Sequence, residues 1–240
     1  MNKLFILSGA SGAGKSTLLD RLVKAEAGQA ATKYSERKRY NTVDDVSTVD
    51  NILNPELHCD IVYSMYGNRY GFNSSMLKSQ LKISNLLLIT NDKLAIEKLR
   101  TIFPRQVIVV YIVSDINKRL LRQIYMKRHG VPSMKGILVS LLKQLGIAEQ
   151  TLLHDNGEEF IQCIDRINNL IDDIVLQEEE FRLRLDSIKY QEELYSQGLF
   201  TYDYTVLNLY SNTMSTVHAT ESAFKQLKRI ISKETEDEHE

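Results

Sequence analysis

The sequence predicts an α/β fold of three layers, with helices on both faces of a parallel sheet and a long helical segment inserted before the last strand. Near the N-terminus, a short apolar strand runs into a glycine-rich loop and then into an amphipathic helix. Two later apolar runs end in polar residues, which is typical of buried parallel strands. Residues 158–197 contain neither glycine nor proline and repeat apolar residues at helical spacing.

The composition is that of a globular protein. Of 240 residues, 43% are hydrophobic and 25% are charged, which excludes a disordered or fibrous chain. Thirty basic residues against 31 acidic ones give a net charge of −1, so nucleic acid is not an expected partner. Cys59 and Cys163 are far apart and form no zinc-binding pair. No apolar run is long enough to span a membrane, and we expect a soluble, cytoplasmic protein.

The glycine-rich loop occupies residues 9–16, which read Gly-Ala-Ser-Gly-Ala-Gly-Lys-Ser. This stretch matches the pattern G-x-x-x-x-G-K-[ST] at every position. An apolar strand over residues 4–7 precedes it and a helix with an apolar face follows, as the motif requires. A glycine-rich turn that carries Lys-Ser by chance is the alternative, and the agreement of both flanks argues against it.

The pattern is typical of the phosphate-binding loop of P-loop NTPases. Its glycines let successive backbone N–H groups point at phosphate oxygens, and the helix N-terminus adds partial positive charge. We expect Lys15 to reach the β- and γ-phosphates of a purine nucleoside triphosphate, and the Ser16 hydroxyl to bind Mg²⁺. The expected nucleotide-binding residues are Gly9, Ser11, Gly12, Ala13, Gly14, Lys15, Ser16 and Thr17.

Residues 86–89 and 107–113 are the two further apolar runs, followed by Asp92 and Asp115 respectively. Ligands of open α/β sheets lie beyond the carboxyl ends of the strands, so topology places both carboxylates near the loop. Capping the next helix is the commoner role of such an aspartate. A last strand is expected at residues 202–207, ending in Asn208, and a last helix at residues 220–231.

Five segments, taken in chain order, resemble the landmarks of the guanylate kinase-like nucleoside monophosphate kinases. They are residues 8–18, 66–71, 86–100, 111–130 and 202–231. The first resembles the family's phosphate loop, the second its Tyr-Gly-Thr segment and the third its central strand with the helix after it. The fourth resembles its Phe-Ile strand and lid-entry helix, and the fifth its Asp-Tyr-x-Val-x-Asn strand and last helix.

The resemblance implies phosphoryl transfer from ATP, with Mg²⁺, to an acceptor held opposite the loop. Such transfer depends on positioning and charge neutralisation, so it needs a lysine, a metal ion and mobile arginines. Lys15, Arg128 and Arg184 match the catalytic set. Arg182 is the alternative to Arg184, and a solvated helix arginine is the plainer role of each. Asn208 would touch the base or ribose of ATP, or else be an ordinary residue at a strand end.

The acceptor side departs from the family pattern of Ser-x-Thr-Thr-Arg-x-x-Arg. Residues 33–40 read Lys-Tyr-Ser-Glu-Arg-Lys-Arg-Tyr, so the arginines are two apart rather than three, and Phe72 replaces the threonine after Tyr-Gly. Arginine forks suit a phosphate group. The implied acceptor-binding residues are Ser35, Arg37, Arg39, Asp44, Tyr70 and Asp92. We expect a GMP-like nucleoside monophosphate. A branch that phosphorylates ribose 1,5-bisphosphate fits about as well, and an exposed basic loop is the plainer interpretation.

The segment between Arg128 and Arg182 is far longer than the family's lid. Residues 131–153 predict one or two short helices whose apolar face is Ile137, Leu138, Leu141, Leu142 and Leu145. Further on, apolar side chains alternate at spacings of four and three, which is typical of a coiled-coil seam. The seam comprises Phe160, Ile164, Ile167, Ile171, Ile174, Phe181, Leu185, Ile188 and Tyr195, with breaks at Glu178 and Glu192.

The expected organisation is a kinase core over residues 1–130, with an acceptor-binding segment at about 33–80. Next comes a helical insertion and lid over residues 131–198. The chain then returns to the core over residues 199–232 and ends in an acidic tail over residues 233–240. The long helix either packs on its own chain or forms an interface, through residues 158–197, with a second copy or a partner protein. The predicted function is an ATP-dependent phosphotransferase. The alternative is a nucleotide-binding regulatory module whose long helix passes the bound state to a partner.

Overall fold

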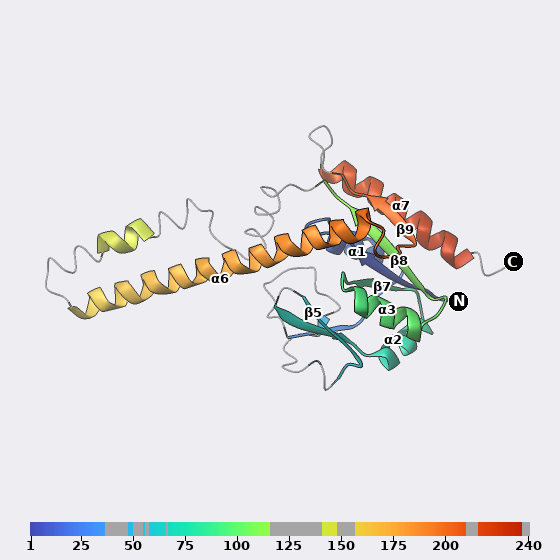
Figure 1. The fold of residues 1–240 in the computed structure, drawn as a ribbon, viewed down its shortest axis with the longest axis horizontal. Coiled ribbons are helices and arrows are strands. Elements are labelled where there is room, and N and C mark those ends of the chain that lie inside the picture. The colour runs from blue at the N-terminus through green and yellow to red at the C-terminus, as the bar shows by residue number, and fades with distance from the viewer. Residues whose placement is uncertain are drawn as a thin grey trace. The chain divides into compact units, whose positions relative to one another are not determined.

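In the computed structural model, β1 (Leu4–Ser8) is the central strand of a five-stranded parallel sheet (Figure 1). The neighbours of β1 are β7 (Leu86–Ile89) and β8 (Val107–Val113), and the edges are β2 (Gln29–Ala30) and β9 (Tyr204–Leu207). All four pairings are parallel. The predicted α/β fold with a parallel sheet is confirmed, and β7 and β8 have the predicted bounds.

The structure describes residues 1–36, 48–49, 55, 58–65, 67–115, 141–147, 157–209 and 216–236. Four predicted site residues lie outside this part of the chain: Arg37, Arg39, Asp44 and Arg128. The chain forms two compact units. The first joins Met1–Leu121 with Arg184–Glu240, and the second is Arg122–Leu183.

Alternating side chains of the parallel sheet build a hydrophobic core on each face. Leu4 and Ile6 of β1 pack in one core with side chains of α3, whereas Phe5 and Leu7 pack in the other with side chains of α1 and α7. Helices on both faces of a parallel sheet give the predicted three layers. The bounds of these helices are Lys15–Lys24 for α1, Lys93–Ile102 for α3 and Thr216–Glu236 for α7.

A second sheet follows the first βαβ unit and has the order β4-β3-β6-β5. Its hairpin joins β5 (Ile61–Met65) to β6 (Asn68–Phe72), and β3 (Lys33–Ser35) pairs antiparallel with β6. The short strand β4 (Thr48–Val49) lies parallel to β3. The helix α2 (Ser74–Leu81) comes next, and Asn73 caps it by accepting a hydrogen bond from the Met76 backbone N–H at 3.0 Å. This sheet lies within the predicted acceptor-binding segment.

The long helix α6 runs from Gly157 to Ser196 as one element of 40 residues, close to the predicted bounds. At about 1.5 Å per residue, such a helix is roughly 60 Å long. Its last turns belong to the first unit, where Leu194 packs in the same core as Leu4 and Ile6.

Two backbone hydrogen bonds fix the C-terminal end of α6. The Leu199 N–H donates to the Leu194 carbonyl at 3.0 Å, and the Gly198 N–H donates to the Tyr195 carbonyl at 3.2 Å. Gly198 has φ +63°, the left-handed conformation that this helix ending requires. The ending fixes the rotational phase in which the preceding turns face the core.

Phe181 of the predicted seam is buried, and the seam as an interface with a second copy or a partner stays a prediction. The last turns of α6 bury other side chains within this chain. There the buried side chains are Arg184, Gln191 and Leu194, one position before the predicted Leu185 and Tyr195, and Tyr195 is 39% exposed. The prediction counted only apolar residues, whereas Arg184 and Gln191 are buried because they find hydrogen-bond partners in the core unit. No coiled coil is therefore needed to explain the burial of this part of α6.

Residues 141–147 are helical, within the predicted short helices. Leu142 and Leu145, two residues of the predicted apolar face, are 63% and 54% exposed. The strand β9 begins at Tyr204, two residues later than predicted, and the Asp203 carboxylate before it accepts hydrogen bonds from the Val109 backbone N–H (2.7 Å) and from Arg100 (2.9 Å). Helix α7 extends to Glu236, into the predicted acidic tail.

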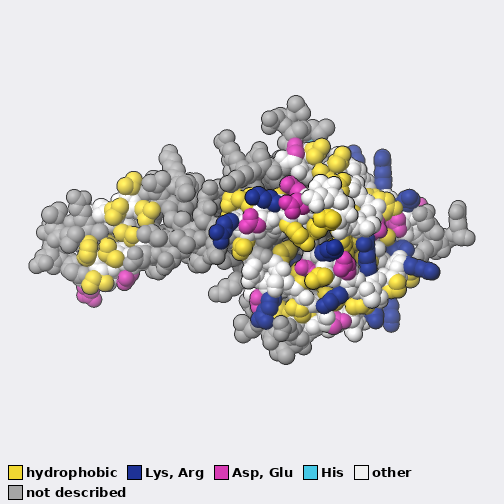
Figure 2. All heavy atoms as spheres, viewed as in Figure 1, with side chains coloured by type: hydrophobic (Ala, Val, Ile, Leu, Met, Phe, Trp, Pro, Cys, Tyr) yellow, Lys and Arg dark blue, Asp and Glu magenta, His cyan; other side chains and the backbone are white. Residues whose placement is uncertain are grey.

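Basic and acidic side chains are interspersed on the face that Figure 2 shows, in keeping with the nearly balanced charge of the chain. Among the described helices, none is long and apolar enough to cross a bilayer.

Candidate functional site

The loop between β1 and α1 is curled by glycines in conformations that other residues rarely adopt. Gly9, Gly12 and Gly14 have φ of +134°, +85° and +83°. Gly14 is the N-cap of α1 and provides no side chain to cap the helix, so the first turn of α1 offers backbone N–H groups and the positive end of the helix dipole. A loop of this shape at a helix N-terminus suits an anion such as a phosphate chain.

Lys15 lies over this loop. Its Nζ donates to the carbonyl oxygens of Gly9 and Ala10 at 2.6 and 2.7 Å. The ammonium group therefore lies at the loop, and its contact with a nucleotide phosphate stays a prediction. Ser16 and Thr17 follow in the first turn of α1, with Ser16 half-buried and Thr17 exposed.

Three contacts brace the loop from other elements. A side chain on Gly9 would place its Cβ 2.5 Å from the Ile112 carbonyl oxygen of β8, so only glycine fits. The Gly9 N–H donates to Asn91 Oδ1 at 3.1 Å, from the end of β7. Asn208 Nδ2 donates to the Ala13 carbonyl at 2.8 Å, from the end of β9. The carboxyl ends of three strands thus hold the loop.

Asn208 is fully buried, and its side-chain amide donates to the loop backbone. Sequence reasoning assigned Asn208 to the ATP base or ribose and missed this bracing role. The contact with the nucleotide stays a prediction.

Arg184 of α6 also lies at the loop. It is 7% exposed, and its Nη1 donates to Ser11 Oγ at 3.4 Å. Arg182, the alternative that the sequence left open, is exposed. The structure therefore places Arg184, like Lys15, at the loop, and its catalytic role stays a prediction.

Asp92 and Asp115 have different surroundings. Asp92 is the N-cap of α3, where its Oδ1 accepts a hydrogen bond from the Ala95 N–H at 2.7 Å. This is the capping role that the sequence analysis weighed against ligand binding, and it engages one carboxylate oxygen. Asp115 is exposed just after β8.

Ser35 and Tyr70 of the second sheet are both buried. The Tyr70 ring stacks on Tyr63 with centroids 5.5 Å apart, and Lys33 Nζ lies 5.2 Å from the Tyr70 ring centroid. Burial raises the pKa of the Tyr63 hydroxyl far above its ordinary value, so Tyr63 stays protonated. Phe72, which replaces the family threonine, is fully buried and packs on Tyr63.

Glu36 and Arg69 form the described ion pair of this sheet. The Glu36 carboxylate accepts hydrogen bonds from the Arg69 backbone N–H at 2.7 Å and from Arg69 Nε at 2.9 Å. The backbone hydrogen bond, followed by the guanidinium contact, holds the pKa of Glu36 below its ordinary value. The pair joins the end of β3 to β6.

We expect Glu36→Gln to lower the free energy of unfolding at pH 7 by about 0.5–1 kcal/mol. Because folding lowers the pKa of Glu36, its contribution is fully present above the unfolded pKa, about 4.3, and is lost as the pH falls through the folded value. Urea unfolding of both proteins at pH 7 and at pH 3 measures this. Glu97→Gln, which removes a carboxylate 3.9 Å from Lys93, is the control with a smaller expected loss. An equal loss for Glu36→Gln at both pH values would contradict the assignment.

The donors at the loop fit a nucleoside triphosphate. The backbone N–H groups of a curled loop, a lysine ammonium and a guanidinium suit phosphate oxygens, and the Ser16 hydroxyl is an oxygen ligand of the kind that Mg²⁺ accepts. Within the described ranges, no cluster of three or more His, Cys, Asp or Glu side chains could hold a metal ion by itself.

Sequence reasoning missed Asn91 and Gln191 as parts of this site. Asn91 supplies the acceptor for Gly9, and Gln191 Nε2 donates to the Asn91 carbonyl at 2.9 Å. The polar end of β7 was a signal for Asn91, but position 191 carried no motif.

Comparisons with known proteins find a likeness of fold. No family model matches the chain, and no curated protein matches its sequence. Among solved structures, guanylate kinase from Anaplasma phagocytophilum is similar with a TM-score of 0.52 and 15% identity, over 97% of this chain and 86% of that one. At this identity the likeness concerns the fold, and the chain has a guanylate kinase-like P-loop fold.

Proposed function

We propose that the protein is an ATP-dependent phosphotransferase that transfers the γ-phosphoryl group to a small phosphorylated acceptor. One observation carries the proposal: two cationic side chains from different elements, Lys15 and Arg184, contact three consecutive residues of the loop, Gly9 to Ser11. A loop that only binds a nucleotide needs its N–H groups, whereas phosphoryl transfer also needs cations that neutralise charge at the transferring group.

In this proposal the N–H groups of the loop bind the β-phosphate, and Lys15 leaves the carbonyl oxygens of Gly9 and Ala10 for the β- and γ-phosphates. Mg²⁺, bound with Ser16, would neutralise negative charge on the phosphates. Arg184 would stabilise the charge that spreads over the transferred group, together with Arg128. No strong base is required, because positioning and charge neutralisation supply most of the rate.

The acceptor would bind between the second sheet and the end of β7. The second sheet would contribute Ser35 and Tyr70, Asp92 would contribute from the end of β7, and Arg37, Arg39 and Asp44 complete the set predicted from the sequence. A GMP-like nucleoside monophosphate is the proposed acceptor, and the fold likeness to a guanylate kinase supports this choice. Ribose 1,5-bisphosphate has the same phosphate chemistry and is the second candidate.

The experiment is ADP release from ATP and Mg²⁺, measured against GMP, dGMP, AMP, CMP, UMP and ribose 1,5-bisphosphate. We expect one acceptor to raise ADP release at least about 100-fold over the acceptor-free rate, and Lys15→Ala to abolish the rise. Lys24→Ala, which removes an exposed lysine at the other end of α1, is the matched control. Tight ATP binding without any acceptor response would contradict the proposal.

That outcome would favour the second candidate, a nucleotide-binding regulatory module. The observation in its favour is that α6 is one continuous helix, which carries Arg184 at the loop and begins at Gly157 in the second unit. Residues 158–197 would then be the surface for a second copy or a partner protein.

A further inference from the structure

Asn91 is held by hydrogen bonds on two sides. Its side-chain Oδ1 accepts from the N–H of Gly9, the first residue of the phosphate loop, at 3.1 Å. Its backbone carbonyl accepts from Gln191 Nε2 of α6 at 2.9 Å. Asn91 is itself buried, and the next residue, Asp92, is fixed as the N-cap of α3. A displacement of the Asn91 backbone would therefore also move the acceptor of the Gly9 N–H hydrogen bond.

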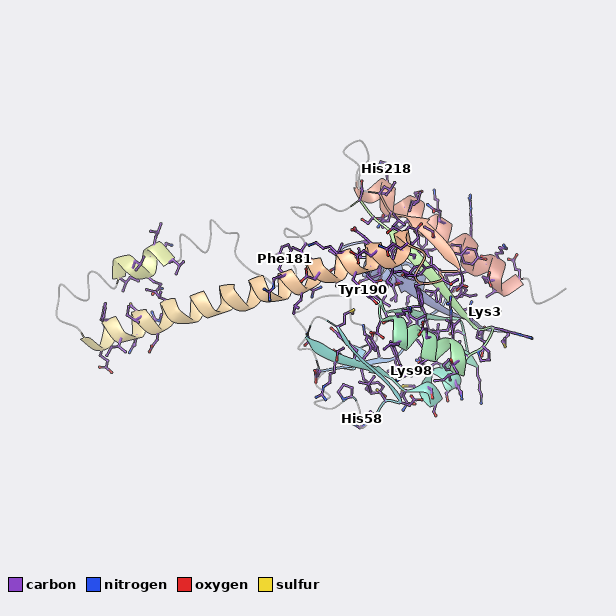
Figure 3. The ribbon with its side chains drawn as sticks, viewed as in Figure 1. Lys3, His58, Lys98, Phe181, Tyr190 and His218 are labelled. Atoms are coloured by element: carbon purple, nitrogen blue, oxygen red, sulfur yellow. The ribbon has the colours of Figure 1, made fainter. Side chains whose placement is uncertain are left out.

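The Gln191 side chain of α6 is only 3% exposed. The preceding residue of the same helix, Tyr190, is exposed (Figure 3). A buried glutamine costs free energy unless it is hydrogen-bonded, so its amide is held to the one acceptor that faces it. A carbonyl oxygen only accepts, so the Gln191 NH₂ group is the one that faces Asn91. Among described residues, its Oε1 has no partner.

The backbone of Gln191 is fixed as well. The Tyr111 hydroxyl of β8 donates to the Gln191 carbonyl at 3.3 Å, and the Tyr111 ring stacks on Tyr195 with centroids 4.3 Å apart. Arg184, two helical turns earlier, contacts Ser11 of the same loop. Helix α6 thus reaches the loop at two points, directly through Arg184 and indirectly through Gln191 and Asn91.

We propose that Gln191 is a positioning residue that acts through Asn91: its side-chain amide holds the Asn91 backbone, and Asn91 Oδ1 holds the Gly9 N–H in the conformation that receives the phosphate chain. Docking of the last turns of α6 and formation of the loop are then one event. The inference deepens the proposed function and rests on it for turnover, but not for the structure of the free loop.

The test is a double-mutant cycle of Gln191→Leu and Asn91→Ala. The primary measurement is hydrogen exchange of the Gly9 amide in the nucleotide-free protein, which does not depend on any activity. We expect Gln191→Leu to speed this exchange about 5- to 10-fold in the wild-type background and to have little further effect in the Asn91→Ala background. ATP affinity, measured by calorimetry with Mg²⁺, should fall about 3- to 10-fold with the same non-additivity.

Gln162→Leu is the matched control, because Gln162 is an exposed glutamine of the same helix. Should Gln191→Leu fail to fold, Gln191→Met, which is also unbranched, takes its place. Unchanged exchange at Gly9, or an effect of Gln191→Leu that is equal in both backgrounds, would overturn the proposal and leave Gln191 a packing residue. Faster, non-additive exchange in a protein that shows no acceptor-dependent turnover would support the positioning role and refute the proposed function.

Discussion

Alanine in place of Gly9 is expected to weaken ATP binding severely and to destabilise the protein strongly. The added Cβ would lie 2.5 Å from the Ile112 carbonyl oxygen and 3.2 Å from its nitrogen, and both are backbone atoms of β8 that cannot rotate away. The φ of +134° is also strained for any residue with a side chain. Overpacking and backbone strain together cost about 2–6 kcal/mol.

The loop can avoid this clash only by moving, and movement breaks the hydrogen bond from Gly9 to Asn91. We therefore expect the Kd for ATP, measured by calorimetry, to rise at least about 100-fold, which corresponds to roughly 2.7 kcal/mol. The Tm should fall by roughly 5–20 °C for a chain of this size.

Gly67→Ala is the matched control, because Gly67 has φ +75° but nothing within 4 Å of the added Cβ. It should cost only about 1–2 kcal/mol and leave ATP affinity unchanged. Equal losses of stability for the two variants would show that strain at φ, rather than the contact with β8, accounts for the effect at Gly9.

Arg184→Met is expected to lower kcat about 100- to 1000-fold, while the Kd for ATP changes by less than about fivefold. Methionine keeps the helix propensity and much of the buried volume of arginine, so the helix should persist. The lost guanidinium is a charged donor beside the loop, and donors that stabilise charge developing in a transition state have effects of this size. Steady-state rates with the acceptor identified in the panel provide the measurement.

Arg182→Met is the control, since Arg182 is exposed on the same helix two residues earlier. Its kcat should stay within about twofold of the wild-type value. Loss of kcat in Arg182→Met, or a loss of ATP affinity without any change of kcat in Arg184→Met, would contradict the role assigned to Arg184. Arg184→Lys keeps the charge but loses the planar fork, and an intermediate kcat is expected for it.

The three central strands of the parallel sheet were predictable because they carry their own signal, whereas the two-residue edge strand β2 was not predicted. Both β7 and β8 are continuous apolar runs bounded by polar residues, and burial on both faces demands that composition. The phosphate loop was predictable for a related reason, because its backbone requires positive φ angles that glycine adopts readily. The second sheet was placed only as an acceptor-binding segment, because its short strands mix polar and apolar residues.

Buried polar residues were the part that the sequence could not reveal. Gln191 and Asn208 can be buried because each side-chain amide donates a hydrogen bond to a backbone carbonyl that is far away in the sequence. A pattern that counts apolar residues along α6 passes over Arg184 and Gln191, so it does not identify the polar side chains that the last turns of α6 bury within the chain. Partners distant in sequence leave no local periodicity, so such residues become visible only in the folded structure.

The fixed ending of α6 has a consequence for how the chain can change over evolution or under engineering. Gly198 and its two hydrogen bonds set the phase of the helix from its C-terminal end, and both Gln191 and Arg184 are counted back from that point. Insertions and deletions before Arg184 therefore leave both side chains in register with the loop. A single residue gained or lost between Arg184 and Gln191 turns Arg184 away by about 100°, and one between Gln191 and Gly198 turns both away. The length of the insertion is free to vary, whereas the stretch from Arg184 to Gly198 is not.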